Sequence, residues 1–231
     1  MKTKILLSAA AVAALALAGC GQKSGDNTTA STDTANTTTA SADNTGGPGQ
    51  TKPVNDAQDA MSAPVGMASA ETLGSHESGA FVTNAAISDM YEIQAAKLAE
   101  QKGQSPAVKT FAKQMIKDHT ATSTELKGLV SKGGVKATIP TDLDQRRKGM
   151  LDNLTASQGK DFDTRYAAQQ LAAHQEAVTM FTGFAKNGDN DALKAWAGQT
   201  APKLQHHLDM AQQLKSSAGG ESNGGGNTTG Q

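Results

Sequence analysis

The chain has 231 residues, a formal net charge of −1, and 37% hydrophobic but only 3% aromatic residues. All the aromatic residues lie between Phe81 and Trp196, so only this part of the chain can build a sizeable apolar core. A near-neutral charge without a long basic stripe argues against a nucleic-acid partner. The single cysteine, Cys20, excludes an intramolecular disulfide, a Cys-based zinc knuckle and a CxxC redox centre.

Residues 1–19 have the pattern of a lipoprotein signal peptide. Two lysines precede an apolar run from Ile5 to Ala18, which at 1.5 Å per residue is about 21 Å long, too short for a bilayer core of about 30 Å. The run ends in Leu17-Ala18-Gly19-Cys20, which resembles the bacterial lipobox. We therefore expect cleavage before Cys20 and lipidation of its thiol. The alternative is an ordinary cleaved signal with an incidental free thiol.

Lipidation of Cys20 predicts a protein anchored to a membrane of the cell envelope. Gly21 follows where inner-membrane lipoproteins carry Asp, so in a Gram-negative host the resemblance implies an outer-membrane lipoprotein facing the periplasm. Residues 20–75 are of low complexity and are predicted to form a lipid-anchored disordered linker. As a flexible coil of about 55 residues, this linker has an r.m.s. reach of roughly 40 Å. The Gly-rich residues 216–231 are predicted to be a disordered tail.

Residues 76–215 are predicted to form one all-α domain with four long helices, at about residues 78–102, 105–133, 160–186 and 190–215. Short connections at Gly103-Gln104 and Asn187-Gly188 require antiparallel neighbours. About 25 residues separate the second helix from the third, and they contain a shorter amphipathic segment. Two antiparallel hairpins joined by one long crossover predict a ferritin-like antiparallel four-helix bundle.

Each of the four apolar stripes carries one residue of metal-ligand type near its middle: Glu92, His119, His174 and His207. Residues near the midpoints of antiparallel helices lie at one level, so these side chains are expected to converge. Three imidazoles and one carboxylate suit one Zn, Cu, Ni or Fe ion, whereas Mg or Ca requires more oxygen ligands. The alternative is a metal-free polar network in which these groups bond to one another. The Glu-x-x-His motifs of carboxylate-bridged iron pairs are absent from the sequence, so ferroxidase chemistry is not expected.

Charged residues beside the four stripes are expected to play smaller roles. Asp118, His206 and Asp209 point away from the stripes and are predicted to be outer hydrogen-bond partners at most. The basic run Arg146-Arg147-Lys148 on the crossover is predicted to be a solvated face.

The predicted helices carry elements that resemble a bacterial family, the domain of unknown function DUF4142. The elements are Glu92, Lys97-Leu98-Ala99, Phe111-Ala112, Met115, Asp118-His119, Phe162-Asp163, Tyr166, His174, Pro202-Lys203-Leu204 and His207-Leu208. The resemblance covers about residues 78–215 and implies an exported ferritin-like bundle, often associated with the outer membrane. It implies no established reaction.

These patterns together predict a lipid-anchored envelope protein with a helical binding or structural module around one transition-metal ion. The expected partner is the membrane, through Cys20, and the sequence names no protein partner. No catalytic triad, phosphate loop or pair of glycosidase acids is present in the sequence, so an enzyme is not favoured. Two alternatives stay open: a periplasmic metal-dependent or redox enzyme, which would need an open coordination position, and an envelope adaptor, which would need an exposed apolar patch.

Overall fold

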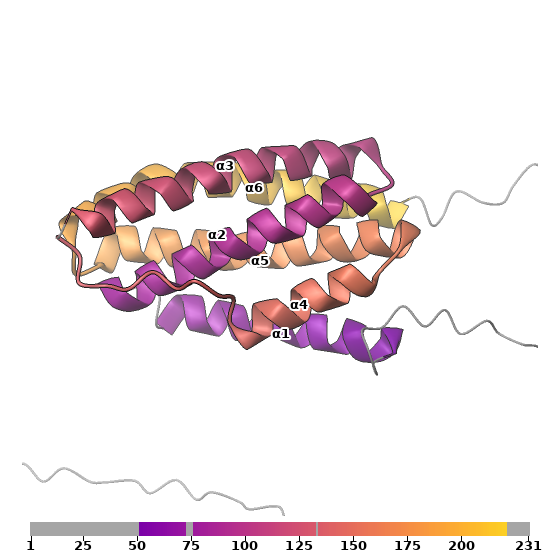
Figure 1. Cartoon of the computed structure of the whole chain (residues 1–231), viewed down its shortest axis with the longest axis horizontal. Helices are drawn as coiled ribbons and strands as arrows, with labels where there is room; N and C mark the ends of the chain where they lie inside the picture. The colour runs from indigo at the N-terminus through magenta and orange to yellow at the C-terminus, as the bar shows by residue number, and fades with distance from the viewer. Residues whose placement is uncertain (1–50, 73–75, 133, 221–231) are drawn as a thin grey trace, which may run out of the picture. The chain divides into compact units, whose positions relative to one another are not determined.

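The computed structural model describes residues 51–72, 76–132 and 134–220, and these residues form six α-helices and no strand. The helices are α1 (Lys52–Thr72), α2 (Ser78–Lys102), α3 (Pro106–Ser131), α4 (Gln145–Ala156), α5 (Gly159–Asn187) and α6 (Asp191–Gly220). The four long helices predicted from the sequence are α2, α3, α5 and α6, and α4 is the shorter amphipathic segment (Figure 1). The signal peptide, Cys20 and the first part of the predicted linker lie outside the described residues.

The four long helices form two antiparallel hairpins, α2 with α3 and α5 with α6 (Figure 1). Residues 134–144 and α4 cross from the end of the bundle where α3 ends to the other end, where α5 starts. One long crossover between two hairpins is the connectivity of a ferritin-like bundle. The predicted fold class is therefore confirmed.

The turn between α2 and α3 is fixed by side-chain caps. Ser105 Oγ accepts a hydrogen bond from Val108 N at 3.1 Å, and Pro106 occupies the first position of α3. Asp163 of α5 accepts hydrogen bonds from the backbone N–H groups of Gln104 and Ser105, at 2.9 and 2.8 Å. One carboxylate on the second hairpin therefore holds the turn of the first hairpin in place.

The bundle core consists of two apolar clusters that follow each other along the helices. Large members of the first cluster are Tyr91, Phe111, Met115, Phe162 and Tyr166, and large members of the second are Phe81, Leu126, Phe181, Phe184 and Trp196. On α3, α5 and α6 a buried histidine lies between the residues of one cluster and those of the other. A polar layer therefore divides the core across its middle.

Residues 52–72 form helix α1, so the predicted disordered linker over residues 20–75 is wrong for this segment. The buried face of α1 consists of Asn55, Ser62, Gly66 and Ala70, which share one helical face but include no large apolar side chain. Buried large apolar residues at helical spacing are the usual sign of a helix that packs on a core, and the buried face of α1 lacks them. The predicted tail is also wrong in part, because α6 continues to Gly220.

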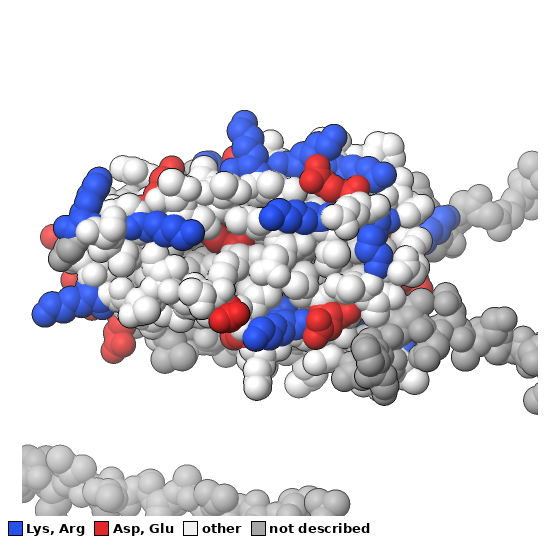
Figure 2. Space-filling model, viewed as in Figure 1, with Lys and Arg blue, Asp and Glu red and all other residues white. Residues whose placement is uncertain are grey.

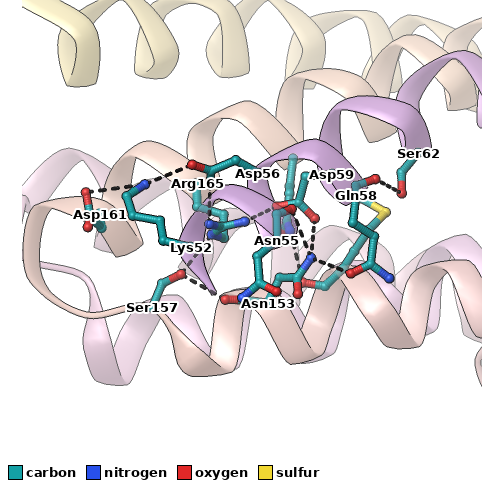
Figure 3. A network of polar contacts seen from close by, with 12 residues as sticks. Lys52, Asn55, Asp56, Gln58, Asp59, Ser62, Asn153, Ser157, Asp161 and Arg165 are labelled. Carbon is teal, nitrogen blue, oxygen red and sulfur yellow. Dashed lines mark hydrogen bonds and ion pairs between the residues drawn. The ribbon is translucent and has the colours of Figure 1, made fainter. Parts of the chain in front are cut away.

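Helix α1 docks on α4 and α5 through polar contacts (Figure 3). Arg165 of α5 forms ion pairs with Asp56 and Asp59 of α1, and its Nε donates to Ser157 Oγ at 2.8 Å. Asn153 of α4 donates to Asp59 at 2.9 Å. The Arg165 side chain is only 6% exposed, so its buried charge depends on carboxylates that α1 supplies.

A second buried ion cluster joins α4 to α5. Arg146 Nη2 donates to both carboxylate oxygens of Glu176 at 2.9 Å, and Arg147 Nη2 donates to one of them at 2.6 Å. Arg147 also pairs with Asp144 at 2.8 Å. The prediction of a solvated basic face is therefore wrong for both arginines, and only Lys148 of that run is exposed.

Gly66 of α1 packs against the Glu176 cluster. A Cβ at position 66 would overlap Glu176 Oε2 and would lie 2.9 Å from Arg146 Nη1. Because two arginines hold the Glu176 carboxylate, it cannot move aside without losing ion pairs. We expect Gly66→Ala to lower the free energy of unfolding in urea by about 1–3 kcal/mol, the usual cost of overpacking.

Gly128→Ala on α3 is the matched control for Gly66→Ala, because a Cβ at position 128 meets nothing within 4 Å. Alanine inside a helix is favoured over glycine, so this variant should be more stable by about 0.5–1 kcal/mol. Equal changes in the two variants would contradict the close packing of α1 on the cluster.

Charges on the surface are mixed. Figure 2 shows Lys and Arg side chains spread over one face, several of them adjacent along the upper edge, with Asp and Glu between the others. The large hydrophobic residues exposed in the described part of the chain are Val54, Met61 and Val65, all on α1. Within residues 51–72, 76–132 and 134–220, no helix has both the length and the hydropathy needed to cross a membrane.

Candidate metal centre

Three of the four predicted metal ligands meet in the polar layer of the core. His119 of α3, His174 of α5 and His207 of α6 are 1–2% exposed, and their ring centroids are 5.4–5.7 Å apart. One ring nitrogen of each lies within 4.8 Å of the other two. Two ligand atoms on one ion are at most about 4.2 Å apart, because metal–nitrogen bonds are about 2.0–2.1 Å long. A small adjustment would therefore place all three on one ion.

Each imidazole uses one ring nitrogen in a hydrogen bond to the protein. His119 Nδ1 is 2.8 Å from Asp89 Oδ1, and His207 Nε2 is 2.8 Å from Asp118 Oδ2. His174 Nδ1 is 2.9 Å from the carbonyl oxygen of Gln170, one turn earlier on its own helix. Carboxylate and carbonyl oxygens only accept, so the ring nitrogen that faces each of them carries the proton.

The second nitrogen of each ring has no hydrogen-bond partner: these atoms are His119 Nε2, His174 Nε2 and His207 Nδ1. In the neutral rings each is a lone pair without a proton, so the three cannot satisfy one another. A buried polar atom without a partner costs about 1–3 kcal/mol. The histidines therefore do not form the predicted metal-free network by direct hydrogen bonds, and their lone pairs require a cation or water.

Burial keeps two of the imidazoles neutral. Burial, followed by the charges of His119 and His207, lowers the pKa of His174 well below its usual value. Burial also lowers the pKa of His207 to about 4, although Asp118 acts in the opposite direction. For His119, burial is outweighed by the hydrogen bond and charge of Asp89, which raise its pKa. At neutral pH, His174 and His207 are thus unprotonated at their free nitrogens.

Asp89 is an outer partner that the sequence pattern did not identify. It is 6% exposed and accepts hydrogen bonds from Thr122 Oγ1 at 2.9 Å and Ser123 Oγ at 3.1 Å, besides its contact with His119. The two hydroxyls hold the carboxylate in place against the imidazole. The sequence could have indicated Asp89 through its position, because it lies three residues before Glu92 and therefore on the same side of α2.

Asp118 lies where an outer partner was predicted. Gln114 Nε2 donates to the carboxylate oxygen that also contacts His207, at 2.6 Å. Burial raises the pKa of Asp118, but the hydrogen bonds from Gln114 and His207 outweigh it and the pKa is lowered. His206 and Asp209, the other candidates of this kind, are exposed and take no part in the centre.

Glu92 is buried but is not one of the residues whose ligand atoms lie within 4.8 Å of one another. Neither of its carboxylate oxygens has a hydrogen-bond partner. Burial raises the pKa of Glu92 to about 7, and the charge of His119 is the largest opposing influence. The Gln170 amide is near enough to Glu92 to lower its pKa, but neither this amide nor the buried Tyr166 hydroxyl has a partner within hydrogen-bond distance. Tyr166, Gln170 and His174 follow one another at four-residue intervals along α5, so they share one face of that helix.

A comparison with models of known protein families finds a match over most of the chain. Residues 63–214 match the model of a domain of unknown function, DUF4142. The chain belongs to the DUF4142 family. The resemblance seen in the sequence is therefore confirmed, and the match reaches into α1 as well as the four long helices of the DUF4142 domain.

One solved structure similar to this DUF4142 chain is titled "CopM in the Cu(II)-bound form". The two share 21% sequence identity with a TM-score of 0.52, and the alignment covers 61% of this chain and 97% of that one. At this identity the likeness shows a common fold. A comparison with curated protein sequences finds no match to the DUF4142 chain.

Proposed function

We propose that this DUF4142 protein binds one transition-metal ion through His119, His174 and His207, in a helical module held at the cell envelope. The observation that carries the proposal is the convergence of three buried imidazoles, each with one ring nitrogen that has no hydrogen-bond partner. Asp89, Asp118 and the Gln170 carbonyl fix the tautomer and orientation of the rings, as outer partners of metal-bound histidines do. The site is therefore arranged for a cation before one binds.

Copper is the first candidate among Zn, Cu, Ni and Fe. Imidazole nitrogens suit all four ions, and Cu(II) binds a given nitrogen site more tightly than the other divalent ions of the series. The structure with a similar fold whose title names bound Cu(II) supports the same choice. A metal-dependent or redox enzyme is the second candidate function, because three protein ligands leave a coordination position open.

The test of the proposed function is metal binding by the full chain, purified without an added histidine tag. We expect one equivalent of copper to bind and to raise the melting temperature, because an ion at 100 times its Kd stabilises a folded protein by about 2.7 kcal/mol. Zinc should bind at the same place with lower affinity. A protein that stays metal-free, with an unchanged melting temperature after addition of copper, zinc, nickel and iron, would contradict the proposal.

The envelope location depends on Cys20, which lies outside the described residues. Lipidation of this residue with two or three acyl chains would give stable membrane attachment, whereas one chain binds only marginally. We expect Cys20→Ser to move the protein from the membrane fraction to the soluble fraction of cell extracts. Ser24→Ala, a change in the same segment, is the control and should leave the distribution unchanged. Membrane retention of Cys20→Ser would contradict a lipid anchor.

A further inference from the structure

Three polar side chains without hydrogen-bond partners lie in the core. One is on α2, and the other two are on α5, the helix that also carries His174. Both oxygens of Glu92, the amide of Gln170 and the hydroxyl of Tyr166 have no hydrogen-bond partner. These side chains are almost completely buried, with 0–1% exposure. Buried polar groups in native proteins nearly always bond to protein or to ordered water. A metal ion on the three histidines would leave these groups still unsatisfied unless a further ligand joined them.

The Glu92 carboxylate does not lie within 4.8 Å of all three nitrogen ligands. Ligands on one ion lie at most about 4.2 Å apart, and Glu92 is not among the groups that lie within even 4.8 Å of one another. Glu92 nevertheless lies one helical turn after Asp89, which contacts His119, so both carboxylates are on the side of α2 that faces the histidines. A carboxylate on this side of the centre can reach a bound ion through an intervening molecule.

Resting on the proposed function, we propose that the bound metal ion keeps an exchangeable fourth ligand, a water molecule, between itself and Glu92. Three protein ligands with a solvent molecule in the fourth position is the arrangement of open metal sites, whereas four protein ligands close a site. The water donates to the Glu92 carboxylate, and Gln170 and Tyr166 provide the remaining hydrogen bonds. The occupant of this position is a small ligand that bonds to the metal through one donor atom.

A nearby bound cation favours the ionised form of Glu92, and the charge of this carboxylate gives the fourth position a selectivity. A neutral ligand that donates hydrogen bonds, such as water, satisfies the carboxylate, whereas an anion meets a like charge in a poorly solvated site. Replacing Glu92 by Gln removes that charge, keeps the side-chain size and supplies an N–H donor. The Gln variant should therefore accept an anion that the wild-type protein binds weakly.

The experiment titrates the full chain loaded with Cu(II) with azide, and follows the new charge-transfer absorption and the electron paramagnetic resonance spectrum. Glu92→Gln is expected to bind azide about tenfold more tightly than wild type or better, which corresponds to about 1.4 kcal/mol. Its Cu(II) affinity should fall by no more than about 10–100-fold, because the change affects an outer group and not a ligand. The matched control is Glu100→Gln, which removes the same charge from an exposed position on α2 and should behave as wild type.

Each other result counts against the inference. A loss of Cu(II) affinity of much more than about 100-fold in Glu92→Gln would identify Glu92 as a direct ligand. Copper binding without any azide response in wild type and Glu92→Gln would mean a closed site. Both results overturn the fourth position while leaving the histidine site intact. A wild-type protein that binds no copper would defeat the proposed function itself.

A crystal structure of the copper-loaded wild-type protein tests the same point without a variant. We expect a solvent oxygen bonded to copper and within hydrogen-bond distance of Glu92. A Glu92 oxygen at about 2.0–2.2 Å from the ion would overturn the inference. This structure would test the water ligand even if Glu92→Gln does not fold.

Discussion

The His207→Ala variant is expected to bind copper more than about 100-fold more weakly than the wild-type protein. The substitution leaves two imidazole nitrogens on the ion, and loss of an outer partner alone already weakens metal sites 10–100-fold. Competition with a chelator of known affinity would measure the change in Kd. The copper-dependent rise in melting temperature should disappear at the same metal concentration.

His206→Ala is the matched control for His207→Ala. The two histidines are adjacent in the sequence, but His206 is exposed whereas His207 is 1% exposed and faces the other two imidazoles. His206→Ala should keep the wild-type copper affinity. Equal losses in both variants, or no loss in His207→Ala, would contradict the assignment of the site.

The largest effect on stability is expected from Glu176→Ala, which should lower the free energy of unfolding by about 3–5 kcal/mol. Arg146 and Arg147 both lose their bonds to this carboxylate, and the Arg147 side chain is only 5% exposed. Arg147 keeps only its pair with the part-exposed Asp144 and cannot recover its hydration, so most of the cost is desolvation rather than lost attraction. Urea denaturation followed by circular dichroism would measure the change.

Glu100→Ala is the control for Glu176→Ala, because it removes an exposed carboxylate from α2 without breaking an ion pair that the structure shows. Exposed substitutions of this kind usually change stability by less than about 0.5 kcal/mol. A loss below about 1 kcal/mol in Glu176→Ala would place its ion pairs in the range of surface pairs and contradict the role of the cluster.

Much of the fold could be predicted because the four long helices bury large apolar residues at helical spacing. Their ends carry strong signals, such as Ser105-Pro106 at the start of α3. Helix α1 could not be found in this way, because its buried face consists of small and polar residues. The prediction that Arg146 and Arg147 are solvated failed for a related reason. Their acidic partner, Glu176, lies on another helix, and the local sequence does not indicate this contact.

The level of the three histidines could be predicted, but their chemistry could not. Counting residues from the helix ends places His119, His174 and His207 at one height, and the structure brings them together. Which ring nitrogen is free depends on hydrogen bonds to Asp89 and Asp118, which come from other helices and leave no trace in local spacing. The position of Glu92 likewise depends on ångström-scale packing that the spacing of residues does not contain.

The polar docking of α1 gives the domain two kinds of stability. Detachment of α1 alone would expose little apolar surface, so it would have a small heat-capacity change and only a weak dependence on urea. Unfolding of the bundle exposes the aromatic clusters, so it has a large heat-capacity change and depends strongly on urea. Loss of α1 would leave Arg165 buried without its carboxylates. The attachment of α1 therefore depends on the charges of Arg165 and its two carboxylate partners. Helix α1 is also the first described helix after Cys20 in the sequence.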